Sequence, residues 1–305
     1  MIAPRSFLFV PGDSERKMAK AEGTAAHAIV LDLEDAVATE HLAAARELVR
    51  EYLLSRRDRS RQQIWVRINP IESDKALADL ARVVAGTPDG LLLPKCGSGQ
   101  DIARLHHYLT ALEIREGVPK GAIHIVAVAT ETPGSLFEFG TYRGASGRLH
   151  GLTWGAEDLS TAVGATTNKG DDGAYGFTYQ MARSLCLLGA KAAGVHAIDS
   201  ILPNFRDAGA LAQEVRRARQ DGFNAKFAIH PDQVAVINAG FRPDADEIAR
   251  AREIVAAFEA SGGVGAFQVR GLMMDRPHLT QALAILESAE PESSADAGRP
   301  RELAR

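Results

Sequence analysis

The sequence predicts an α/β fold: a closed TIM (β/α)8 barrel followed by a C-terminal helical and loop extension. Short apolar runs alternate with segments of helical period along most of the 305-residue chain, a pattern typical of a parallel sheet connected by helices. Eight such runs occur, the number that closes a barrel of about 250 residues. An open doubly wound sheet is the rival, but the first run is not followed by a glycine-rich phosphate turn.

The eight apolar runs are the expected strands, each short enough to be buried on both faces of a parallel sheet. They cover residues 6–10, 28–33, 64–69, 90–94, 124–131, 151–158, 196–202 and 226–230. Between them, apolar side chains recur every three or four residues, which indicates amphipathic helices. Thr39 and Asp207 are expected to cap helix N-termini, and Gly222 is expected to end the helix that follows Asp207.

The chain continues past the eighth expected strand, so we divide it into a barrel, residues 1–240, and an extension, residues 241–290. The extension has a helical pattern, a glycine-rich hinge at residues 261–265, a short apolar run and a last helix. It exceeds what a barrel needs, and we expect it to pack on the barrel mouth or on a neighbouring subunit. Residues 291–305 are polar and contain proline and glycine, so we expect a disordered tail.

The composition is that of an ordinary globular protein, with 46% hydrophobic residues and a formal net charge of −4. Mild acidity argues against binding to nucleic acid or to an anionic membrane. Apolar stretches all fall short of the roughly 18 residues that a membrane span needs, and the N-terminus does not resemble a secretion leader. Two cysteines, Cys96 and Cys186, cannot form a disulfide framework. The expected location is therefore cytoplasmic.

Two acids end apolar runs in which a carboxylate has no packing purpose. Glu131 closes the fifth run and Asp158 closes the sixth. In a TIM barrel the C-terminal ends of the strands carry the chemistry, and oxygen ligands from two carboxylates suit a hard divalent cation. We therefore expect Glu131 and Asp158 to bind a metal ion. Another strand-end acid, Asp35, is expected to cap a helix or to pair with a nearby base.

Basic residues also lie near the ends of the expected strands. Arg67 alternates as an inward-facing residue, so we expect it to bind a substrate carboxylate in preference to forming a structural ion pair. Lys95 fits a site role and a structural pair equally well. His230, before Pro231, is expected to be structural. A thiolate role for Cys96 is disfavoured because no histidine is an evident partner.

Seven motifs occur in order with barrel-like spacing. They are residues 5–12 (RSFLFVPG), 32–35 (DLED), 66–70 (VRINP), 93–95 (LPK), 131–132 (ET), 155–159 (GAEDL) and 229–233 (IHPDQ). Together they resemble the citrate lyase β-subunit type of the HpcH/HpaI aldolase superfamily, a group that includes malyl-CoA, methylmalyl-CoA and citramalyl-CoA lyases. The resemblance covers about residues 4–290.

The resemblance implies a TIM barrel that binds Mg²⁺ through Glu131 and Asp158. It implies that Arg67 contacts the substrate carbonyl or carboxylate, with Glu131 also in the substrate site. Asp275, in the C-terminal segment, matches an aspartate that reaches a neighbouring subunit's site as the acid/base. This arrangement requires an oligomer, and we expect a homotrimer or a homohexamer.

The implied function is a Mg²⁺-dependent carbon–carbon lyase. Its substrate would be a β-hydroxyacyl-CoA thioester, cleaved to an acyl-CoA and a small α-keto acid, glyoxylate or pyruvate; the reverse reaction is a condensation. One alternative is a citrate lyase-type subunit acting on an acyl-carrier-protein thioester. Others are an aldolase acting on free hydroxy-keto acids and a catalytically inactive barrel that serves as a binding subunit.

Two departures from the family pattern bear on substrate identity. Arg270 stands where some relatives have an acid, and the seventh expected strand ends in Pro203-Asn204, where an acid is usual. Basic residues near the first strand are candidates to bind the CoA phosphates, although solvated helix-face charge is as good an interpretation. They are Arg5, Arg16, Lys17 and Lys20.

Overall fold

The computed structural model describes residues 4–262 and 265–289. Eight parallel strands close into a barrel in sequence order, with β1 paired to both β2 and β8. The strands are β1 (Ser6–Pro11), β2 (Ala28–Asp32), β3 (Gln63–Arg67), β4 (Gly90–Leu93), β5 (His124–Val128), β6 (Leu149–Thr153), β7 (His196–Asp199) and β8 (Ala225–Ala228). The predicted (β/α)8 fold is confirmed.

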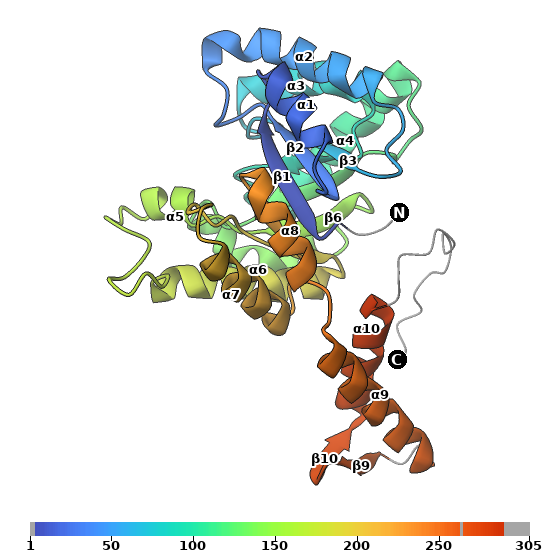
Figure 1. Ribbon diagram of the computed structural model, residues 1–305. Helices are drawn as coiled ribbons and strands as arrows, with labels where there is room; N and C mark the ends of the chain where they lie inside the picture. The colour runs from blue at the N-terminus through green and yellow to red at the C-terminus, as the bar shows by residue number, and fades with distance from the viewer. Residues whose placement is uncertain (1–3, 263–264, 290–305) are drawn as a thin grey trace. The chain divides into compact units, whose positions relative to one another are not determined.

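Helices surround the strands in Figure 1. They are α1 (Glu15–Glu22), α2 (Leu42–Ser55), α3 (Asp74–Val83), α4 (Gly99–Glu116), α5 (Glu157–Ala162), α6 (Phe177–Ala193), α7 (Ala208–Asp221) and α8 (Pro231–Gly240). Short 3-10 turns join them: η1 (Thr39–His41), η2 (Val84–Gly86), η3 (Gly134–Phe137) and η4 (Phe139–Tyr142). Turns η3 and η4 form the connection from β5 to β6.

The helix-boundary predictions had mixed outcomes. The Asp207 side chain accepts a hydrogen bond from the backbone N–H of Ala210, and Gly222 ends α7 at a φ of 111°, as predicted. The cap at Thr39 was wrong. Thr39 is the first residue of η1, and α2 starts after His41 without a side-chain cap. The 3-10 turn holds the chain there with backbone hydrogen bonds, so a capping hydroxyl is not required.

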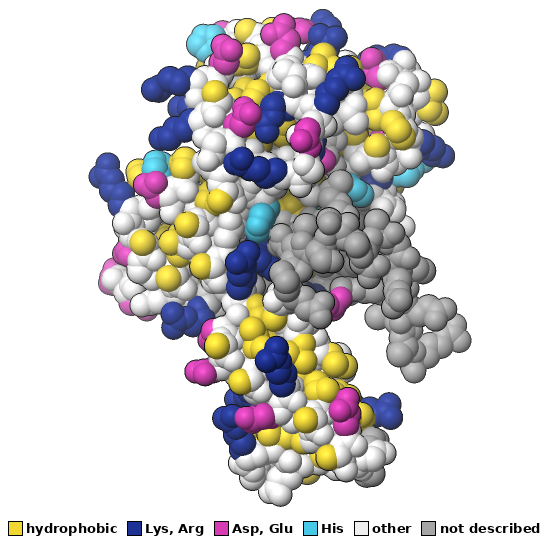
Figure 2. All heavy atoms as spheres, turned by 45° about the vertical axis from the view of Figure 1, so that its right-hand side comes forward, with side chains coloured by type: hydrophobic (Ala, Val, Ile, Leu, Met, Phe, Trp, Pro, Cys, Tyr) yellow, Lys and Arg dark blue, Asp and Glu magenta, His cyan; other side chains and the backbone are white. Residues whose placement is uncertain are grey.

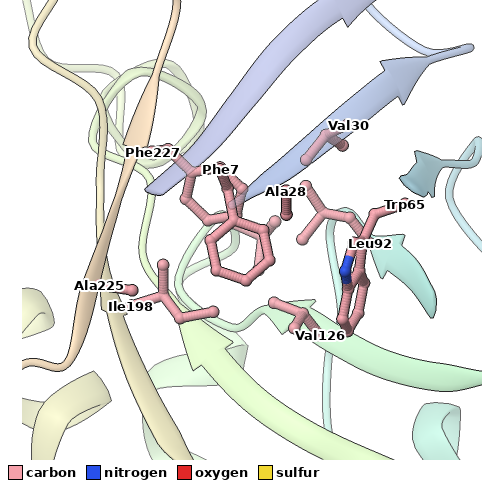
Figure 3. Packing of buried hydrophobic residues seen from close by; sticks show 10 residues of the cluster. Phe7, Ala28, Val30, Trp65, Leu92, Val126, Ile198, Ala225 and Phe227 are labelled. Atoms are coloured by element: carbon pink, nitrogen blue, oxygen red, sulfur yellow. The ribbon is translucent and has the colours of Figure 1, made fainter. Parts of the chain in front are cut away.

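Large apolar side chains fill the barrel interior, and Figure 3 shows them converging from different strands. Phe7 packs edge-on against Trp65, with ring centroids 5.7 Å apart, and against Phe227 at 5.3 Å. A register irregularity in β6 leaves His150 without a strand partner. The His150 ring lies 5.6 Å from the Trp65 ring and 4.7 Å from the His196 ring. The interior is therefore packed, and space for chemistry is at the strand ends.

Backbone contacts divide the chain into a barrel unit, Pro4–Asn238, and a C-terminal unit, which is the described chain from Ala239 onward. The C-terminal unit contains α9 (Ala245–Ala260), β9 (Ala266–Val269), β10 (Leu272–Asp275) and α10 (Arg276–Ala289). The two strands pair antiparallel. The expected hinge falls partly, and the expected tail wholly, outside the described residues. The packing of the extension remains a prediction.

The C-terminal unit has its own small core, which includes Ile254, Phe267 and Met274. Leu272 and Met273 of β10 are exposed, and Figure 2 shows yellow apolar groups on the visible face of the C-terminal unit. In the same view, basic and acidic side chains are interspersed over the barrel unit. Among the described residues, no helix has the length and apolarity needed to cross a membrane.

Candidate active site

Most of the polar residues predicted at the strand ends line one cavity of about 410 Å³. Its charged lining includes Asp32, Asp35, Arg67, Glu131 and Asp158. Its apolar wall combines four aromatic side chains, Phe9, Trp154, Tyr175 and Phe227, with aliphatic ones such as Leu92, Val128 and Ile201. The barrel unit thus brings the predicted metal ligands and the predicted substrate-binding arginine together.

Several strands end earlier than the sequence predicts. β5 ends at Val128 and β6 at Thr153, so Glu131 lies in a loop and Asp158 in the first turn of α5. Both acids were expected inside strands. The apolar pattern continues past the strand ends because loop residues such as Ala129, Trp154 and Ala156 are still buried.

Arg67, the last residue of β3, is fixed by carboxylates. Its Nε and Nη2 atoms donate to Asp32 at 2.7 and 2.6 Å, and its Nη1 lies 3.0 Å from Glu34 and 3.1 Å from Asp35. The guanidinium also lies over the Phe9 ring, 4.9 Å from its centroid. Arg67 therefore forms a structural ion pair, the less favoured of its two predicted roles. Asp35 pairs with a base, Arg67, which was one of the two roles predicted for it. Substrate contact by Arg67 remains a prediction.

Glu131 is a buried carboxylate with 6% of its surface exposed. Burial raises the pKa of Glu131 to about 8, although the Lys95 backbone N–H, which donates to Oε2 at 2.5 Å, acts in the opposite direction. Nearby Asp158 and Glu34 add to the increase. A Cβ on Gly155 would lie 3.3 Å from Glu131 Oε1, so glycine leaves the carboxylate room. Burial therefore disfavours the ionised carboxylate, and a bound cation would favour it.

Lys95 links the remaining acids. Its Nζ lies 2.6 Å from Glu34 Oε1 and 3.2 Å from Asp158 Oδ1. Burial also raises the pKa of Glu34, against the effect of Arg67. The structure therefore adds Glu34 to the site, although the sequence showed it only as part of a strand-end acidic run.

These residues fit a magnesium ion. Five acids (Asp32, Glu34, Asp35, Glu131 and Asp158) surround only two bases, Arg67 and Lys95. In the described ranges, no three His, Cys, Asp or Glu side chains are grouped as metal ligands. Mg²⁺ accepts one or two protein carboxylates and keeps several waters, so the pair Glu131 and Asp158 is a sufficient protein contribution. The two carboxylates offer only oxygen ligands, which suit hard cations such as Mg²⁺ better than soft metals.

Other predicted positions lie outside this cavity. His230 stacks on Phe205 with centroids 4.5 Å apart, which agrees with a structural role. Burial raises the pKa of the Cys96 thiol to about 12, which agrees with the prediction against a thiolate. The seventh strand needs a correction. It does not reach the predicted Pro203-Asn204. The last residue of β7 is Asp199, an acid that pairs with Lys226 of β8 in the sheet.

Asp275 belongs to the C-terminal unit, where it ends β10. Its Oδ1 lies 2.5 Å from His278 Nδ1, and its backbone N–H donates to the same nitrogen at 3.3 Å. His278 was not among the predicted site residues. An Asp-x-x-His spacing across a strand-to-helix junction was the available signal, because side chains three residues apart meet in the first turn of a helix.

A family model described as HpcH/HpaI aldolase/citrate lyase matches residues 5–231, and one described as a carbon–carbon bond lyase of the TIM-barrel fold matches residues 179–291. The chain belongs to the HpcH/HpaI aldolase/citrate lyase family. The predicted family and its lyase class are thus confirmed.

Relatives of known name cover nearly the whole chain. A (3S)-malyl-CoA thioesterase of Cereibacter sphaeroides is 32% identical over 94% of both chains. The citrate lyase subunit beta of Haemophilus influenzae is also 32% identical, over 94% of this chain and 97% of its own. The structure is similar to CitE from Mycobacterium tuberculosis in complex with magnesium, acetoacetate and coenzyme A. That match has a TM-score of 0.79 and 32% identity, and covers 94% of this chain and 98% of CitE.

Proposed function

We propose that this family member is a Mg²⁺-dependent carbon–carbon lyase that cleaves a β-hydroxyacyl-CoA thioester, such as malyl-CoA or citramalyl-CoA, into an acyl-CoA and an α-keto acid. The observation that carries the proposal is the buried Glu131 carboxyl group, which lines one cavity together with Asp158 and Arg67. The similarity to CitE, which was crystallised with magnesium, acetoacetate and coenzyme A, supports the same assignment.

Glu131 and Asp158 are the residues that would hold Mg²⁺. The bound ion would supply a Lewis acid for the carboxylate and hydroxyl oxygens of the substrate. Glu131 then also borders the substrate, since both residues line the same cavity as Arg67. The aromatic wall of Phe9, Trp154 and Phe227 limits water access and strengthens the electrostatic interactions.

Arg67 is suited to stabilise a developing enolate oxygen or to bind a carboxylate. Asp32 holds the guanidinium plane through two hydrogen bonds, so little side-chain entropy is lost on substrate binding. Nη1 is shared with Asp35, whose side chain is 59% exposed. A substrate oxygen can replace this solvent-exposed partner without breaking the buried contacts. Such preorganised donors are the main source of transition-state stabilisation in acyl chemistry.

The chemistry requires two proton transfers and is redox-neutral. The hydroxyl proton leaves, the bond between the carbinol carbon and the thioester α-carbon breaks, and its electron pair forms the thioester enolate. The hydroxyl carbon becomes the keto carbon, and a proton is added to the enolate α-carbon. We assign this second transfer to Asp275 of a neighbouring subunit in a homotrimer or homohexamer. The reverse sequence condenses acyl-CoA with glyoxylate or pyruvate.

The second candidate is a citrate lyase-type subunit that acts on an acyl-carrier-protein thioester. The citrate lyase subunit of Haemophilus influenzae is as similar as the malyl-CoA relative, which favours this candidate over the remaining alternatives. An inactive barrel is disfavoured because Arg67, Glu131 and Asp158 all line one cavity. Arg16, Lys17 and Lys20 remain candidates for the CoA phosphates, since all three are exposed on α1. We place the protein in the cytoplasm, because Cys96 and Cys186 are both free.

The deciding experiment offers malyl-CoA, methylmalyl-CoA and citramalyl-CoA to the purified full chain with Mg²⁺ and follows the release of glyoxylate or pyruvate. EDTA and the Glu131→Gln variant are the controls. Cleavage that both controls abolish supports the CoA-thioester lyase. Cleavage of a citryl carrier-protein thioester alone favours the second candidate. Undiminished cleavage in EDTA refutes the metal assignment.

A further inference from the structure

Within the described barrel unit, Lys95 is the one residue that contacts both proposed metal ligands through hydrogen bonds or ion pairs. Its backbone N–H donates to Glu131 Oε2 at 2.5 Å, and its Nζ lies 3.2 Å from Asp158 Oδ1. The same Nζ lies 2.6 Å from Glu34 Oε1. The ammonium group therefore already supplies positive charge to the acids that are expected to receive a divalent cation.

The Lys95 backbone is in the left-handed region, with a φ of 49°. A side chain with a Cβ is disfavoured there, and such conformations persist where the surroundings require them. Here the conformation directs the N–H toward the buried Glu131 carboxylate. The residue thus has two separable contacts: the backbone positions Glu131, and the side chain neutralises Asp158 and Glu34.

We propose that Lys95 is a positioning residue that holds the two metal ligands in the metal-free protein and competes with the divalent cation for Asp158. This inference rests on the proposed metal site. Two positive groups that share one carboxylate repel each other, and the Lys95 side chain is 33% exposed, so it can swing toward solvent when the cation binds. Binding of the divalent cation then replaces the Lys95 ammonium group at Asp158, so the acids have a positive partner both before and after the metal binds.

The proposal predicts that removal of the ammonium group tightens Mg²⁺ binding. Replacement of Lys95 by methionine removes the charge but keeps an unbranched side chain that is one atom shorter, and Lys95→Gly keeps the backbone donor in a residue that tolerates positive φ. Both variants should bind Mg²⁺ about fivefold to tenfold more tightly than the wild type, because a nearby unit charge no longer opposes the ion. The metal-free Lys95→Met protein should melt at a lower temperature, since Glu34 loses a buried partner.

Isothermal titration of the full chain with MgCl₂, together with melting in EDTA, provides the test. Lys120→Met is the matched control: it removes the same charge at an exposed residue and should leave the Mg²⁺ affinity unchanged. Unchanged or weaker Mg²⁺ binding by Lys95→Met overturns the inference while the metal site stands. Failure of the wild type to bind Mg²⁺ overturns the proposed function itself, so the two failures are distinguishable.

Discussion

Replacement of Glu131 by glutamine should have opposite effects on the metal-free and the metal-bound protein. The carboxylate is 6% exposed, and burial raises its pKa from 4.5 to about 8. Glutamine has nearly the same shape, and its side-chain oxygen can still accept the Lys95 N–H. The variant removes the charge that burial disfavours, so the metal-free fold should become more stable. It also removes a ligand, so stabilisation by Mg²⁺ should be lost.

The size of the first effect follows from proton linkage. At pH 7 the unfolded chain has an ionised Glu131, whereas the folded chain keeps the proton. The resulting destabilisation of the wild type is absent below pH 4.5, grows as the pH rises, and is complete above pH 8. Each pH unit in this window contributes about 1.4 kcal/mol. At pH 7 the advantage of the variant is therefore on the order of 3 kcal/mol.

Thermal unfolding in EDTA at pH 7 and pH 5 measures this advantage. We expect Glu131→Gln to melt roughly 5 °C or more above the wild type at pH 7, with a much smaller difference at pH 5. Saturating Mg²⁺ should stabilise the wild type by about 2.7 kcal/mol at a hundredfold excess over Kd, and leave the variant unchanged. Asp158→Asn is the matched comparison. It should lose the Mg²⁺ response without the metal-free gain, because Asp158 is more exposed and pairs with Lys95. Equal or lower melting of Glu131→Gln in EDTA at pH 7 would refute the reasoning.

Three further substitutions test other parts of the molecule. Burial, together with His196 and His124, lowers the pKa of His150 to about 3; the stability this neutral ring provides is full above pH 6.5 and is lost as the pH falls toward 3. Urea unfolding at pH 7.5 and pH 5 should therefore show the wild type losing on the order of 2 kcal/mol relative to His150→Gln as the pH falls, since other titrating groups such as Glu131 act on both proteins alike; a stability difference between the two proteins that does not change with pH contradicts this. Asp275→Asn should lower kcat at least about 100-fold with unchanged Mg²⁺ affinity, and unchanged kcat would move the acid/base role elsewhere. Arg67→Lys should lower kcat/KM about 100-fold; wild-type kinetics would exclude a substrate contact.

The fold was predictable because its signal is repeated eight times. Each strand is a short apolar run, and one misjudged run does not change the count or the alternation. Asp207 and Gly222 were also predictable, since a side-chain oxygen before a helix and a glycine after it serve local backbone needs. At Thr39 the same residue type was misleading, because a 3-10 turn satisfies the backbone there.

The site was predictable as a set of residues but not as a network. Arg67 and Asp32 face each other as register partners on β3 and β2, a relation fixed by strand pairing and invisible in either segment alone. The left-handed backbone of Lys95 is likewise set by what it must contact and has no sequence signal such as glycine. The predicted strands extend beyond the observed ones because buried apolar residues continue into the loops. The pattern of apolar residues in the sequence therefore does not show where the hydrogen bonds between strands end.

Several residues of the site have conformations or charges that lower the stability of the fold. Glu131 and Glu34 are carboxylates whose pKa values burial raises, and Lys95 is a non-glycine residue in a left-handed conformation. A neutral side chain would remove the burial penalty of each acid, and a glycine would remove the backbone penalty at Lys95. Their joint presence in one hydrogen-bonded network, in which Lys95 contacts both acids, is explained if a divalent cation completes the charge balance. The same reasoning makes the metal-free stability of Glu131→Gln a test of function as well as of folding.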